Sequence, residues 1–115
     1  MVRNNVPNRG DIYLVDLGNE TNGPHLCVVI SPREINLVGT CLTVPIATGV
    51  AFARKAGLAV NISSDKTTGV ALCNQVRALD IVARAKLKTA RHVDTLDADT
   101  TDEIVARVVS MIDPA

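Results

Sequence analysis

The sequence predicts a mainly β fold, in which short antiparallel strands form a barrel or a sandwich and a C-terminal α-helix closes the chain. Between residues 11 and 79, short apolar segments rich in Val and Ile alternate with turn-forming residues. After residue 100 the apolar spacing changes to that of a helix. The 115 residues suffice for a single core, so residues 1–115 are expected to form one domain.

The first two strands are predicted at Asp11–Leu17 and His25–Ser31. In the first, the even-numbered and odd-numbered residues face opposite ways. The second is a continuous apolar run, which indicates a strand buried on both faces. Pro32 ends it, because proline cannot donate to a central ladder. The next residues, 33–39, form a short connection with room for one helical turn.

Three further strands are predicted at Thr40–Ile46, Leu58–Ile62 and Val70–Leu79. Pro45 stands near the end of the first of these. Residues 47–57 are small, partly basic and contain glycine, so they are expected to form a loop. The segment "SSDKTTG", residues 63–69, is typical of a turn.

The C-terminal helix is expected to start at a capping box formed by Thr100 and Glu103, in which each side chain bonds the other's backbone N–H. Five apolar residues then recur at helical spacing: Ile104, Val105, Val108, Val109 and Ile112. About three helical turns should pack one face on the strands. A shorter helical turn is expected within Asp80–Lys88.

Charge is distributed unevenly along a chain whose formal net charge is zero. Residues 54–91 hold eight basic and two acidic groups, a net charge of +6, whereas residues 92–115 hold one basic and six acidic groups. A basic middle segment can bind phosphates, or it can be an ordinary solvated surface. No apolar run approaches the ~20 residues that cross a bilayer, and Met1–Gly10 lacks a signal-peptide core, so a cytoplasmic protein is expected.

The three cysteines, Cys27, Cys41 and Cys73, lie in apolar segments and lack a Cys-x-x-Cys spacing. They are interpreted as reduced thiols of the core. The alternative is a metal or catalytic cysteine, but zinc sites need close ligand pairs and His92 is isolated from all three.

The segment "GVALCNQVRALD", residues 69–80, combines a strand-like start with polar residues. Asn74, Gln75 and Arg77 interrupt an otherwise apolar run. Two interpretations stay open from the residues alone. The amide pair can bind a ligand, since amides read base edges and 2′-hydroxyls, or it can satisfy backbone groups beside a bulge.

Five segments together resemble the MazF/PemK-type toxins, including the Kid and ChpB branches: "RGDIYLVDL" (9–17), "VVISP" (28–32) with Asn36, "TVPIAT" (43–48), "FARKAGL" (52–58) and "TTGVALCNQVRALDI" (67–81). The resemblance covers residues 9 to about 112. It implies an SH3-like β-barrel with a C-terminal helix, and a homodimer. It also implies a cofactor-free and metal-independent endoribonuclease of a type II toxin–antitoxin system, which cuts single-stranded RNA and is inhibited by an antitoxin protein.

The resemblance places Asn74, Gln75 and Arg77 beside the RNA groove. Asn74 stands where many members have an aspartate, and an amide cannot transfer a proton at neutral pH, so it is interpreted as an RNA-binding residue. Arg77 matches a basic position, and Leu72 stands where the Kid branch has an arginine.

Metal-free cleavage uses the substrate's 2′-hydroxyl as nucleophile, and it needs groups that move protons and neutralise charge. The resemblance points to two positions for these groups, and this chain differs at both. His25 replaces an arginine, and Ala47, with Thr48 beside it, replaces a threonine. Histidine side chains exchange protons near neutrality, so His25 is the predicted general acid or base, with Arg77 or Arg54 binding the phosphate. His25 could instead bond only to loop backbone.

The loop that covers the groove in relatives contains Thr48, Phe52, Arg54 and Lys55. Phe52 could stack on a base or plug the core, while Arg54 and Lys55 are predicted phosphate contacts. Three alternative functions remain: a degenerate member that binds RNA or antitoxin without cutting, a CcdB-like gyrase poison, and a general single-strand binder. This chain lacks the C-terminal tryptophan expected of a gyrase poison, and it offers only Phe52 and Tyr13 where a general single-strand binder needs several stacking aromatics.

Overall fold

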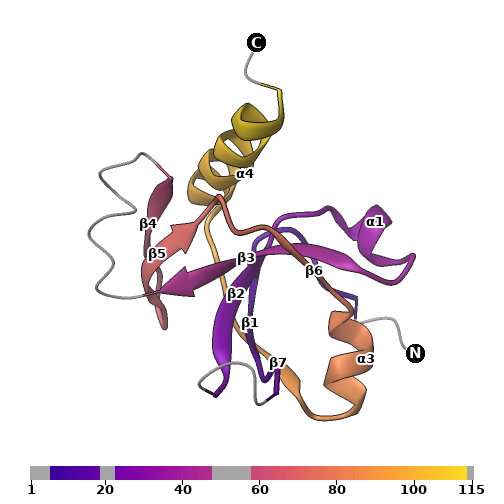
Figure 1. Ribbon diagram of the computed structural model, residues 1–115. Coiled ribbons are helices and arrows are strands. Elements are labelled where there is room, and N and C mark those ends of the chain that lie inside the picture. Colours follow the sequence, from indigo (N-terminus) through magenta and orange to yellow (C-terminus); the bar gives the residue numbers. More distant parts are fainter. Residues whose placement is uncertain (1–5, 19–22, 48–57, 114–115) are drawn as a thin grey trace.

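The computed structural model describes residues 6–18, 23–47 and 58–113 (Figure 1). Its elements, in chain order, are β1 (Asp11–Val15), β2 (His25–Val29), α1 (Arg33–Asn36), β3 (Cys41–Ala47), β4 (Ala59–Ser63), β5 (Thr68–Leu72), β6 (Arg77–Leu79), α3 (Ile81–Lys86), β7 (Ala90–Thr95) and α4 (Ala98–Ile112). The predicted mainly β fold with a C-terminal helix is confirmed. Within these ranges, no helix has the length and apolar character required to cross a membrane.

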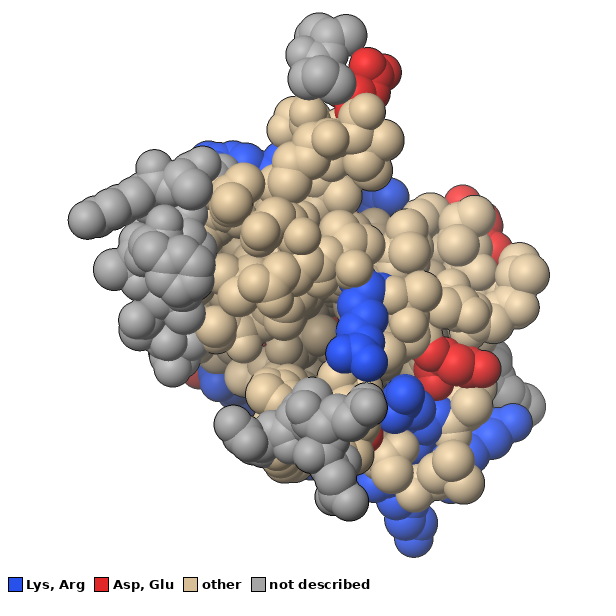
Figure 2. Space-filling model, in the orientation of Figure 1, with Lys and Arg blue, Asp and Glu red and all other residues tan. Residues whose placement is uncertain are grey.

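The strands form one antiparallel sheet in the order β4-β5-β3-β2-β1-β7, and β6 pairs with β3 beside this path. The sheet curls so that the turn after β4 meets β7 at the far end of the order. There Ser64 Oγ donates to Asp94 Oδ2 at 2.5 Å, and the Lys66 backbone N–H donates to the same oxygen at 3.1 Å. In the described part of the chain, side chains therefore close the barrel where backbone pairing does not. One face of the molecule is hollowed near its middle (Figure 2).

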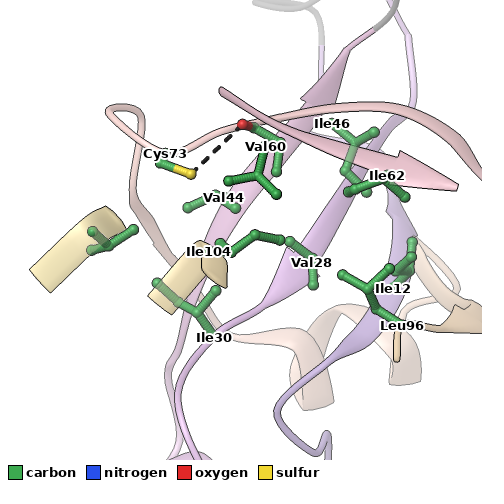
Figure 3. Packing of buried hydrophobic residues seen from close by; sticks show 12 residues of the cluster. Ile12, Val28, Ile30, Val44, Ile46, Val60, Ile62, Cys73, Leu96 and Ile104 are labelled. Atoms are coloured by element: carbon green, nitrogen blue, oxygen red, sulfur yellow. Dashed lines mark hydrogen bonds between the residues drawn. The ribbon is translucent and has the colours of Figure 1, made fainter. Parts of the chain in front are cut away.

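The alternation predicted for the first strand is confirmed, because its two faces enter different clusters. Ile12 belongs to the larger core cluster, and Tyr13 and Val15 belong to the second. The larger cluster joins one face of β1, β2 and β3 to Ile104 of α4 (Figure 3). Helix α4 thus covers one face of the sheet, and the opposite face carries the hollow.

Helix α4 begins earlier than the sequence predicts. Its N-cap is Asp97, whose carboxylate accepts hydrogen bonds from the Thr100 backbone N–H and hydroxyl, both at 2.9 Å. The predicted capping box of Thr100 and Glu103 is therefore wrong, because Asp97 already satisfies the free N–H of the first turn. Of the five apolar residues predicted to pack, Ile104 and Val108 are buried, while Val109 and Ile112 are exposed. The end of α4 projects beyond the sheet (Figure 1).

A buried polar pair fixes the connection between β2 and β3. Ser31 Oγ donates to Asn36 Oδ1 at 2.5 Å and accepts from the Leu42 N–H at 2.9 Å. The Asn36 amide donates to the carbonyls of Pro7 and Ser31. Because these buried groups are all bonded, α1 is held in place and β3 enters the sheet at a defined position.

Three strand predictions need correction. The third strand runs from Cys41 to Ala47, one residue later at each end than predicted. The predicted strand Val70–Leu79 is two strands, β5 and β6, with a turn between them. Strand β7 (Ala90–Thr95) was not predicted, because its "ARHVDT" sequence is mostly polar and has no clear alternation.

Candidate functional site

The hollow has a volume of about 370 Å³ and lies on the sheet face opposite α4. Strands β2, β3 and β6, the segment before β6 and the residue Leu17 form it. Its lining residues are Leu17, His25, Cys27, Thr43, Pro45, Gln75, Val76, Arg77 and Leu79. This volume is in the range of small-molecule and cofactor sites.

The register of the strands explains why these side chains meet. His25 and Cys27 share one face of β2 because successive strand residues alternate. Cys27 lies opposite Pro45 of β3, and Thr43 of β3 lies opposite Arg77 of β6. Three strands thus direct side chains to one place.

A gap in the sheet opens the hollow. On one side of β3, β6 pairs with residues 41–43 and β5 pairs with residues 46–47, so neither pairs with Pro45. A proline here removes no ladder hydrogen bond on that side. Pro45 can therefore sit inside the strand, two residues before its end.

The turn between β5 and β6 answers the question raised by residues 69–80. Cys73 is fully buried and its N–H donates to the Leu58 carbonyl at 2.9 Å, which anchors the end of β5. The Gln75 N–H donates to the Leu72 carbonyl at 3.0 Å, which closes the turn. The chain then crosses to β6 with Asn74, Gln75 and Arg77 exposed. The polar residues interrupt the apolar run because the strand itself is interrupted.

The floor and the rim of the hollow differ in chemistry. The floor is largely apolar and includes Cys27, whose pKa burial raises to about 12, so its thiol stays protonated. The rim carries an imidazole (His25), an amide (Gln75) and a guanidinium (Arg77). Thr43 Oγ1 donates to the Arg77 carbonyl at 2.9 Å and so ties β6 to β3. An apolar floor suits the face of a nucleobase, and the rim can bond to a phosphate or a sugar hydroxyl.

The structure brings His25, Gln75 and Arg77 together, while Asn74 is exposed in the adjoining turn and does not line the hollow. Leu72 is buried in a separate small cluster, against which Ala47 packs. The predicted residues Thr48, Phe52, Arg54 and Lys55 lie outside the described residues.

Sequence reasoning missed most of the floor, namely Leu17, Cys27, Thr43, Pro45, Val76 and Leu79. Strand alternation places residues 25 and 27 on one face, as it does 43 and 45, so part of this set was accessible from the sequence. The prediction that the cysteines are buried thiols holds, since all three are free and buried. In the described ranges, no three His, Cys, Asp or Glu side chains group as a metal site would require.

Comparison with known proteins identifies the family. Residues 8–112 match the family described as "PemK-like, MazF-like toxin of type II toxin-antitoxin system". The chain belongs to this family. Endoribonuclease PemK of Escherichia coli is 32% identical over 111 residues, which cover 90% of this chain and 80% of PemK. The endoribonuclease toxin ChpB of Escherichia coli K12 is also 32% identical, over 98% of this chain and all of ChpB.

Solved structures of family members share the fold. MazF in a MazE–MazF crystal structure (Form II) from Deinococcus radiodurans superposes with a TM-score of 0.71 at 25% identity, and the match covers 94% of this chain and 96% of that one. An endoribonuclease in complex with its cognate antitoxin, from Mycobacterial species, superposes with a TM-score of 0.71 at 19% identity, and covers 94% of both chains.

Proposed function

We propose that this protein is the toxin of a type II toxin–antitoxin pair and that it is an endoribonuclease that cuts single-stranded RNA in the hollow. One observation carries the proposal: His25, Gln75 and Arg77, from separate parts of the sheet, converge on one hollow with an apolar floor. The names of two relatives that are 32% identical, both endoribonucleases, support this activity.

The reaction needs only the substrate's own atoms and groups that move protons. The 2′-oxygen attacks the adjacent phosphorus while the bond from phosphorus to the 5′-oxygen breaks, leaving a 2′,3′-cyclic phosphate and a 5′-hydroxyl. The 2′-hydroxyl loses a proton and the 5′-oxygen gains one. His25 serves one of these transfers, and Arg77 balances the charge that grows on the phosphate oxygens. Thr48 and Arg54, which lie outside the described residues, are proposed to assist these steps.

Substrate recognition follows from the same surface. A base lies on the apolar floor, and Gln75 and Asn74 bond to base edges or 2′-hydroxyls. Phe52 and Lys55, which also lie outside the described residues, are proposed as further RNA contacts.

The proposed partners are a second copy of this chain and an antitoxin, and the similar endoribonuclease in complex with its cognate antitoxin supports the second of these. The proposed location is the cytoplasm. Exposed apolar side chains, such as Leu37, Val38 and Leu42 around α1 and the start of β3, offer surface to a second copy. The basic segment 54–91 suits an acidic antitoxin.

A second candidate function is a protein that binds RNA or antitoxin without cutting RNA. It is favoured by the small number of proton-transfer groups in the hollow. Of the described lining residues, only His25 and Cys27 are of the residue types that commonly transfer protons in enzymes, and Cys27, with a pKa of about 12, holds its proton. Catalysis by His25 alone would leave the second proton transfer to water or to a group outside the described residues.

Incubation of the pure protein with mixed-sequence RNA in EDTA, followed by mapping of the ends, tests the proposal. Discrete cuts that leave 2′,3′-cyclic phosphates are expected, and His25→Ala should slow cutting by about 10²-fold or more, the usual contribution of a general acid or base. His92→Ala, which removes the other histidine of the chain, is the matched control and should retain the wild-type rate. Intact RNA that still binds would establish the second candidate, and cutting within a fewfold of wild type by His25→Ala would exclude this role of His25.

A further inference from the structure

Basic side chains gather where α3 ends and β7 begins. Residues 84–91, "RAKLKTAR", hold four basic groups and no acidic one. We call Arg84, Lys86, Lys88 and Arg91 the basic strip; the last three are exposed, and Arg84 is half-buried. Figure 2 shows basic side chains over α3 and beside the hollow.

The turn that carries the strip is tightly bonded. The Thr89 N–H and hydroxyl both donate to the Arg84 carbonyl, at 2.8 and 3.1 Å, and the Lys88 N–H donates to the Ala85 carbonyl at 3.0 Å. Lys88 takes the left-handed conformation, with φ of 62°, and it is the one described non-glycine residue with a positive φ. Glycine, which has no side chain, is the usual residue in the left-handed conformation at a helix end. This chain instead has a long cationic side chain at that position.

The strip continues from the hollow along the surface. Leu17 lines the hollow and also a second depression, formed with Arg84 and Leu87. That depression shares Asp16 and Thr89 with a third one, which Lys88 and Arg91 line. The three depressions therefore follow one another from the candidate site to the end of the strip.

Few carboxylates neutralise the positive charge of the basic strip. The Asp16 carboxylate accepts from the Gly18 N–H at 2.9 Å, and the Asp80 carboxylate caps α3 by accepting from the Ala83 N–H at 3.0 Å. Within the described ranges, no carboxylate lies within ion-pair distance of the basic strip. Its positive charge is thus available to a polyanion.

We propose that the basic strip binds the phosphates of the single-stranded RNA beyond the nucleotides held in the hollow, so that it sets affinity for long substrates and not the cleavage step. This inference rests on the proposed function, because that function makes single-stranded RNA the ligand of the hollow. RNA is favoured over an acidic protein segment because no aromatic side chain among the described residues lines the second and third depressions, whereas tight protein interfaces use buried aromatic anchors. Exposed lysine and arginine contacts without such anchors are typical of binding to a nucleic-acid backbone.

Binding of RNAs of about 4 and about 16 nucleotides, with 2′-O-methyl groups to block cleavage, tests the strip. The triple variant Lys86→Gln, Lys88→Gln, Arg91→Gln loses three phosphate contacts. For the long RNA, its negative slope of log affinity against log salt should therefore be shallower than that of the wild type by about 2. Between about 50 and 200 mM salt the wild type should then lose roughly 20-fold more affinity than the variant. The short RNA should bind both equally. Lys66→Gln, a basic residue on the β4–β5 turn, is the single-charge control and should leave the slope unchanged.

The variant Lys88→Gly distinguishes a role of Lys88 in RNA binding from a role in the stability of the fold. Glycine relieves the left-handed conformation, so this variant should unfold at a higher temperature and yet bind the long RNA more weakly. A purely structural Lys88 would leave RNA affinity unchanged, and that result would overturn the proposal for this residue.

The remaining outcomes are also decisive. Equal salt slopes for the wild type and the triple variant on the long RNA would overturn the proposal for the strip, even if the wild type cuts unmodified RNA. Loss of long-RNA binding by the triple variant, with no cutting of unmodified mixed-sequence RNA by the wild type, would support the strip and defeat the proposed nuclease. Polyglutamate that binds more tightly than the long RNA, and loses affinity in the triple variant, would assign the strip to an acidic protein instead.

Discussion

The packing of α4 on the sheet can be tested by shortening one side chain. Ile104 is fully buried in the larger core cluster, where it lies with Val28 and Val44 (Figure 3). Ile104→Ala removes three carbon atoms from this site. At about 0.8 kcal/mol per buried methylene the transfer cost is about 2.4 kcal/mol, and the cavity left behind brings the loss of unfolding free energy to about 3 kcal/mol.

The corresponding shift in melting temperature follows from chain length. At about 2.1 cal/mol/K per residue, the 115 residues have an unfolding entropy of about 0.24 kcal/mol/K, so 3 kcal/mol lowers Tm by about 12 °C. A domain of this size has a stability of about 6–17 kcal/mol, so the variant should remain folded at room temperature. Since Ile104 lies on the face opposite the hollow, the folded variant should keep its RNA-cutting rate.

Thermal unfolding followed by circular dichroism, together with urea unfolding, measures the loss. Ile112→Ala is the matched control: it is the same substitution in the same helix, at a side chain that is 78% exposed. Its Tm should stay within about 2 °C of wild type, because surface substitutions cost little. Equal losses in the two variants would refute the packing of α4 described above.

Two further predictions concern the sheet. In thermal unfolding, the Tm of Gly69→Ala should be well below that of Gly39→Ala. Both glycines have a positive φ, but only at Gly69 would an added Cβ lie 2.6 Å from the Ala47 carbonyl oxygen. Similar Tm values would contradict this clash. Hydrogen bonds, the one from Ser64 first, lower the pKa of Asp94 from 3.8 to about 2, so the carboxylate stabilises the fold above pH 3.8 and loses this effect as pH falls through 2. The stability gap between wild type and Asp94→Asn, measured by urea unfolding, should therefore shrink over that interval, and a constant gap would exclude this contribution.

The elements that the sequence predicts well are those with strong apolar periodicity. The first strand is an example, since its alternation places Ile12 and Tyr13 in different clusters. Helix α4 was expected from the spacing of its valines and isoleucines, but its first residue was not. Either Asp97 or Thr100 can cap a helix, and only the backbone geometry shows which one does.

Strand β7 shows where periodicity fails. Its side chains are mostly polar and exposed, so no apolar pattern marks it. It is a strand because its backbone pairs with β1 at the edge of the sheet, with a register shift between Ile12 and Tyr13. Pairing of this kind depends on a partner more than 70 residues away in the sequence.

The sequence by itself determined the class of fold, the buried thiols and, through its motifs, the family. It also marked His25 and Arg77 as chemically capable residues, because residue type and neighbours in the chain carry that information. Only the tertiary structure decided that these two share a hollow with Gln75 while Asn74 lies beside it. The reason is physical: the hollow exists where β5 and β6 leave a gap along β3, and that gap is a property of strand register, which no local segment encodes.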